Sequence, residues 1–131
     1  MSITPELEYL NFSQPYATKT LAAGASDTVF DMPISGGYTG FIEEVWILWR
    51  SDTWLEWIVD GTPATGESRI EHDIGSLDSP KKYNPPIIAR NFIRVVAHND
   101  ASASKTFEVL IDGMLVKPKT EVNKSYVSTT S

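Results

Sequence analysis

Two histidines are the side chains in this sequence best suited to acid–base or metal chemistry. His72 is followed by Asp73, and His98 is followed by Asn99 and Asp100. A metal centre or an acid–base pair would need each imidazole to meet further ligands from elsewhere in the chain. Both histidines lie near expected strand ends, where polar side chains are usual, and the sequence has no cysteine. We therefore predict no metal site and no cofactor.

Carboxylates are the second group that could do chemistry. Glu43 and Glu44 are adjacent in the most apolar stretch of the chain. Because successive side chains of a strand point to opposite faces, we predict that these two cannot act on one substrate. Asp60-Gly61 and Asp112-Gly113 could offer calcium ligands, but Asp-Gly is also a common turn and bulge dipeptide. We interpret the first as a turn and the second as a bulge.

No motif of a known catalytic class accompanies these residues. The sequence lacks the nucleophile elbow of hydrolases, the paired histidines of zinc proteases and a phosphate-binding loop. We therefore predict no catalytic residues and expect that the protein is not an enzyme.

Four tryptophans lie close together in the sequence, at positions 46, 49, 54 and 57. If two strands form a hairpin about Ser51-Asp52, Trp49 and Trp54 lie near its turn. At least one set of rings should pack in the core, and the rest could anchor an interface or stack on sugars. We rank core packing first, a subunit interface second and carbohydrate third. The candidate contacts for a partner or a glycan are Trp46, Trp54, Trp57 and Tyr126.

The elements that must position these residues are strands, because no stretch has convincing helical periodicity. Strands are expected at residues 18–22, 28–32, 40–50, 53–59, 92–98 and 106–116, with a possible short edge strand at 69–74. The strands at 92–98 and 106–116 are expected to pair with each other. Residues 75–86, with three prolines, are expected to form a loop. This spacing predicts an all-β fold of two packed antiparallel sheets, a jelly-roll-like β-sandwich with extended terminal arms.

Alternation within these segments predicts which side chains face the core. The stretch 45–49 is apolar on both faces, which indicates a central strand. Leu55, Trp57 and Val59 are expected to share one face of their strand, and Trp54, Glu56 and Ile58 the other. Ile93, Val95 and Ala97 are expected to share a face, with Val95 toward the core. Phe107, Val109 and Ile111 are expected to point inward.

The chain of 131 residues fits one sandwich domain, which we place at residues 17–116. Residues 1–16 and 117–131 are predicted to be an N-terminal and a C-terminal arm that stay disordered or order on a neighbour. A net charge of −6 argues against direct nucleic-acid binding. We also expect no membrane contact, since no apolar run approaches the roughly 20 residues that a spanning helix needs. No secretory signal is visible, which suits synthesis in a cytoplasm.

Two segments carry a family resemblance. Residues 19–29, Lys-Thr-Leu-Ala-Ala-Gly-Ala-Ser-Asp-Thr-Val, resemble the opening hairpin of small phage and virus β-sandwich proteins, with a turn expected at residues 24–26, and residues 107–116, with Ile-Asp-Gly, resemble their ending. The resemblance implies a virion structural protein of capsid or decoration type, made in the host cytoplasm. It implies contacts with other virion proteins and a homo-oligomer. The alternative is a carbohydrate- or receptor-binding module that uses the tryptophans.

Overall fold

A computed structural model describes residues 6–119 of the chain. Within this range the backbone forms strands and no helix, and so nothing there is a helix long and apolar enough to cross a membrane. The strands are β1 (Leu7–Asn11), β2 (Tyr16–Leu21), β3 (Ser26–Pro33), β4 (Thr39–Ile47), β5 (Thr53–Val59), β6 (Thr62–Pro63), β7 (Lys81–Ala89), β8 (Phe92–Asn99) and β9 (Lys105–Pro118).

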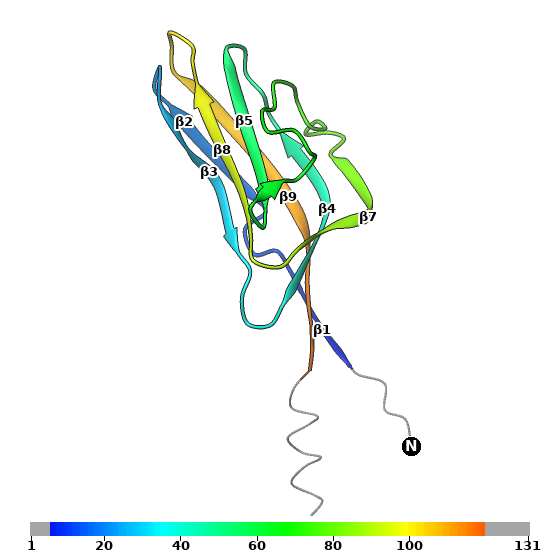
Figure 1. The fold of residues 1–131 in the computed structure, drawn as a ribbon. Coiled ribbons are helices and arrows are strands. Elements are labelled where there is room, and N and C mark those ends of the chain that lie inside the picture. Colours follow the sequence, from blue (N-terminus) through cyan, green and yellow to red (C-terminus); the bar gives the residue numbers. More distant parts are fainter. Residues whose placement is uncertain (1–5, 120–131) are drawn as a thin grey trace, which may run out of the picture.

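Two antiparallel sheets pack face to face as a β-sandwich (Figure 1). The sheet that contains β9 has five strands, in the order β2-β9-β4-β7, with β1 pairing to β9 further along the edge that β2 occupies. The sheet that contains β8 has four, in the order β3-β8-β5-β6. We call them the β9 sheet and the β8 sheet. The all-β class and the two-sheet sandwich predicted from the sequence are confirmed.

The strands pair in a nested order. β2 pairs with β9, β3 with β8, β4 with β7 and β5 with β6. The chain is therefore one long antiparallel ribbon that doubles back at Asp60-Gly61, where both residues have positive φ angles, 54° and 92°. The ribbon then wraps, so that β9 also pairs with β4 and β8 with β5. The turn predicted at Asp60 is thus the reversal point of the whole chain.

Three expected strand pairings are wrong. The hairpin about Ser51-Asp52 does not form, because β4 lies in the β9 sheet and β5 in the β8 sheet. The opening hairpin about residues 24–26 does not form either, because β2 lies in the β9 sheet and β3 in the β8 sheet. β8 and β9, expected to pair, likewise belong to different sheets. In each case a short connection crosses between the sheets, and its local sequence resembles that of a hairpin turn.

The expected loop at residues 75–86 is also partly wrong, since β7 begins at Lys81. Pro85 and Pro86 are tolerated there because β7 is an edge strand, where one side of the backbone needs no ladder partner. Residues 69–74 form no strand. They contribute isolated bridges of Ile70 to Leu55 and of Ile74 to Ile47, which close one side of the sandwich.

Part of the predicted N-terminal arm belongs to the β9 sheet. Residues 7–11 are β1, and Tyr16 begins β2. β9 in turn continues to Pro118, beyond the predicted end of the domain. The boundaries 1–16, 17–116 and 117–131 otherwise stay a prediction. Residues 120–131, which include Tyr126, lie outside the described range.

The core lies between the sheets and follows the predicted alternation. On β4, three consecutive residues, 45–47, are all buried, as expected of a central strand covered on both faces. On β5, β8 and β9, each of the three sets of side chains predicted to share a face is buried, and none of their nine members is more than 6% exposed: Leu55, Trp57, Val59, Ile93, Val95, Ala97, Phe107, Val109 and Ile111.

We expect Phe107→Ala to lower the free energy of unfolding by about 3–5 kcal/mol, because the ring is fully buried and its loss leaves a cavity. Glu108→Ala is the control, since this neighbour points outward and should change the value by less than about 1 kcal/mol. Denaturant unfolding measures both. A larger loss for Glu108→Ala would place the strand one residue out of register.

Candidate functional site

A bulge in β4 brings Glu43 and Glu44 to one surface hollow. Ile42 pairs with Gly113 and Glu44 with Asp112, so that Glu43 is an extra residue in β4. Both glutamates line a hollow of about 470 Å³ together with Asp112. The prediction that the two carboxylates cannot face one substrate is therefore wrong, because the bulge breaks the alternation on which it depended.

Gly113 fits where no other residue would. A Cβ atom placed on it would lie 2.0 Å from the carbonyl oxygen of Phe41, on the neighbouring strand. The bulge predicted at Asp112-Gly113 is present, although the extra residue belongs to the partner strand β4. Sequence alone could not place the insertion on the correct strand.

The hollow presents acidic groups but no assembled ligand set. Lys82 Nζ lies 4.0 Å from a Glu44 carboxylate oxygen, and Asp112 accepts the Gly113 N–H. Tyr83 lines the same hollow, and burial raises the pKa of its hydroxyl. Within residues 6–119 no three histidine or carboxylate side chains gather closely enough to hold a metal ion.

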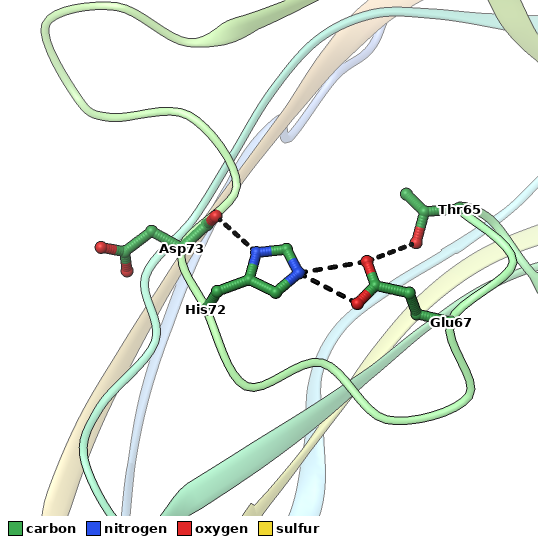
Figure 2. A network of polar contacts seen from close by, with 4 residues as sticks. All are labelled: Thr65, Glu67, His72 and Asp73. Atoms are coloured by element: carbon green, nitrogen blue, oxygen red, sulfur yellow. Dashed lines mark hydrogen bonds and ion pairs between the residues drawn. The ribbon is translucent and has the colours of Figure 1, made fainter.

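His72 is held between two acceptors in the segment that precedes β7 (Figure 2). Its Nδ1 lies 2.9 Å from the carbonyl oxygen of Asp73, and its Nε2 lies 3.0 and 3.1 Å from the Glu67 carboxylate oxygens. Thr65 donates to the same carboxylate. Because both ring nitrogens face acceptors, the doubly protonated ring is favoured. The Asp73 carbonyl first, and then Glu67, raise the pKa of His72 above its ordinary value of 6.5.

The two acceptors thus fix the orientation of this ring and stabilise its protonated form. His72 lines a hollow of about 300 Å³ with Lys81 and Tyr83. Its two contacts join residues 67 and 73, on either side of the buried Ile70. The arrangement therefore secures the segment that covers the edge of β5.

A second histidine lies in a hydrogen-bonded row on the outer face of the β8 sheet. His98 Nδ1 is 2.7 Å from Ser26 Oγ, and its Nε2 is 2.6 Å from a Glu56 oxygen. The three residues come from β3, β8 and β5, and the Trp54 ring stacks on the imidazole at 3.7 Å. Hydroxyl, imidazole and carboxylate in this order are the components of an acyl-transfer triad.

Such a triad also needs N–H donors directed at the developing oxyanion. Near Ser26, the N–H groups of Gly24, Ala25 and Thr28 all donate within the chain. The acceptor for Thr28 is the Asp27 carboxylate, whose negative charge would oppose an oxyanion. The row therefore joins three strands, and we assign it no reaction.

The tryptophans do not form an open platform. Trp57 is 1% exposed and Trp46 is 7% exposed. Trp54 stacks on His98 and also carries the Arg69 guanidinium 4.5 Å from its ring centroid. Of the predicted contact residues that the structure describes, two are therefore buried and the third is engaged within the chain.

The most unusual surface lies at one end of the β9 sheet, where β1 forms the edge beside the last residues of β9. β4 pairs with the other side of β9 as far as Val116, so that only the far end, Leu7–Glu8 with Lys117–Pro118, extends past β4 (Figure 1). Leu7, Tyr9 and Leu10 on β1 are 44%, 56% and 48% exposed. We call residues 6–11 together with residues 114–119 the β1 ribbon. Its strand β1 was not predicted from the sequence, because the five residues Leu-Glu-Tyr-Leu-Asn are too few to indicate a strand by their alternation.

Acidic side chains of the β1 ribbon are neutralised within it. Glu8 accepts a hydrogen bond of 2.7 Å from the Tyr38 hydroxyl and lies 3.6 Å from Lys117 Nζ. The Tyr38 hydrogen bond first, and then Lys117, lower the pKa of Glu8. Glu6 pairs with Lys119 at 3.2 Å.

We expect the His72 ring to titrate above pH 6.5 in NMR and Glu67→Gln to lower its pKa, because one of the two acceptors loses its charge. Glu71→Gln is the matched control, since it removes the same charge from a residue that pairs with Arg69 instead. The raised pKa stabilises the fold fully below the unfolded-state pKa of histidine. This contribution is lost as the pH rises through the folded-state value. Equal shifts in the two variants would contradict the assignment.

Comparison with known proteins assigns no family to this chain. No protein-family model matches the chain, and no curated protein is found to be similar to it. The contacts themselves therefore carry the functional proposal, and the β1 ribbon is the surface best suited to a partner.

Proposed function

We propose that the protein is a non-enzymatic structural protein of a virion, of capsid or decoration type, which acts through protein–protein contacts. The observation that carries this proposal is the β1 ribbon, which exposes three large apolar side chains on an extended sheet edge. Exposed apolar groups and a free strand edge are features by which a sheet recruits another chain.

The strand order supports a jelly-roll topology for the sandwich. The nested pairs β2–β9, β3–β8, β4–β7 and β5–β6 are those of an antiparallel ribbon rolled into two four-stranded sheets, with β1 added to one of them. Jelly rolls occur in viral capsid proteins, and also in lectins and cupins. This support is an analogy at the level of the fold.

The polar arrangements fit a structural protein better than an enzyme. The His72 and His98 contacts each fix neighbouring segments, and neither presents an activated group together with a substrate position. The alternative, a carbohydrate- or receptor-binding module, receives less support because Trp46 and Trp57 are buried. The net charge of −6 favours protein partners over nucleic acid.

We expect the protein to be made in the host cytoplasm and to end in the virion. Particles released from the cells that naturally make it should be separated on a density gradient, and the protein located with an antibody. It should sediment with the particles and stay with them after a salt wash, because apolar contacts are not screened. Finding it only in the particle-free fraction would refute the proposal.

Truncation after Pro118 tests the predicted C-terminal arm, most of which lies outside the described residues. The thermal unfolding midpoint should change little, because the truncation leaves every strand in place. Association with the particle should weaken, since the arm is expected to contact neighbours. If the truncated protein associates with the particle as fully as the intact chain, the C-terminal arm does not contribute to this association.

A further inference from the structure

The free edges of the two sheets are unequally protected against pairing with another chain. β7 carries Pro85 and Pro86 in addition to two lysines, and β3 contains a bulge between residues 28 and 30. β2 is bridged to β3 by the ion pair of Lys19 and Asp27. Prolines, bulges and charges are the usual means of blocking an edge. β1 has no proline and no bulge, and its one charged residue, Glu8, is already neutralised by Tyr38 and Lys117.

The backbone of β1 has a defined outward side. The Glu6 carbonyl accepts from Lys119 N–H at 3.0 Å, and the Phe12 N–H donates to the Gly113 carbonyl at 3.1 Å. Residues with even numbers therefore turn their main-chain groups toward β9. Since this direction alternates along an antiparallel strand, the N–H and C=O groups of residues 7, 9 and 11 point away from β9. No other strand among residues 6–119 pairs with that side.

The charge of the β1 ribbon permits contact with an identical ribbon. The full chain carries a net charge of −6, which would repel a copy. In the ribbon, however, Glu6 pairs with Lys119 and Glu8 pairs with Lys117, so that its charges cancel. Because the far end of the ribbon extends past β4 (Figure 1), a second copy can approach its outward edge there.

We propose that the outward edge of β1 pairs antiparallel with β1 of a second copy of this chain, about a two-fold axis through Tyr9. In this register Tyr9 faces Tyr9 of the second copy, and Leu7 faces Asn11. Each outward N–H and C=O then finds a partner, and exposed side chains of both copies come together. The two β9 sheets become one continuous sheet, and the contact closes as a dimer because both copies use the same surface.

This inference deepens the proposed function and rests on it for its biological role, but the dimer itself is measured without any particle. Sedimentation of the full chain over a range of concentrations should give a species of twice 14.5 kDa. Tyr9→Pro removes an outward N–H while the ladder to β9 stays intact, and it should weaken the dimer by about a hundredfold or more. Tyr9→Thr is the control, since it keeps the N–H and should weaken the dimer by less than about tenfold.

Hydrogen exchange of the unaltered protein provides a test that does not depend on a variant's folding. The amides of residues 7, 9 and 11 should become protected as the concentration rises, while those of residues 8 and 10 are protected at every concentration. If the protein is still a monomer at a concentration of about 1 mM, the dissociation constant is weaker than about 1 mM and the inference is overturned. A dimer that Tyr9→Pro leaves intact would also overturn it. Particle association by a monomeric protein would overturn the dimer and leave the proposed function standing. A dimer that never joins a particle would support the pairing of β1 and refute the proposed function.

Discussion

The pairing of β9 with strands on both of its edges is the interaction on which the rest of the structure depends. Its 14 residues pair with β4 along one edge and with β2 and then β1 along the other. Phe107, Val109 and Ile111 meanwhile fill the core without any exposure. The bulge of β4 forms opposite Gly113 of this strand. The β1 ribbon exists because β9 continues past the end of β2, and at Lys117–Pro118 also past β4. The acidic hollow and the proposed contact surface both follow from one long strand.

Local pattern was sufficient to predict the class of fold and the buried faces. Every second residue is buried in β5, in β8 and in residues 107–113 of β9, because a strand with one covered face must alternate. The turn at Asp60-Gly61 was also predictable, since it depends on the chemistry of a dipeptide. A bulge near Gly113 was predictable too, but not that its extra residue lies in β4. β7 was missed because its prolines resemble those of a loop, and an edge strand tolerates them.

The candidate sites were harder to predict because they depend on pairing between distant segments. Glu43 and Glu44 share a hollow only because the register shifts opposite β9. His98 meets Glu56 and Ser26 only because β8 lies between β5 and β3. A short connection that crosses between sheets also has the same turn residues as a hairpin. Neither the partners of a strand nor the neighbours of its side chains can therefore be derived from local sequence alone.

The nested pairing also determines when the chain can fold during synthesis. β1 and β2 form ladders only with β9, and Tyr16 contacts Glu108, 92 residues later. At about 5–20 residues per second, a ribosome needs roughly 5–20 s to make the intervening chain. Until β9 emerges, these two N-terminal strands have no ladder to join, and the sandwich cannot close. Folding should therefore be completed late, at the slow rates typical of non-local β pairing. Chaperone protection of the N-terminal third would then matter more than that of any later segment.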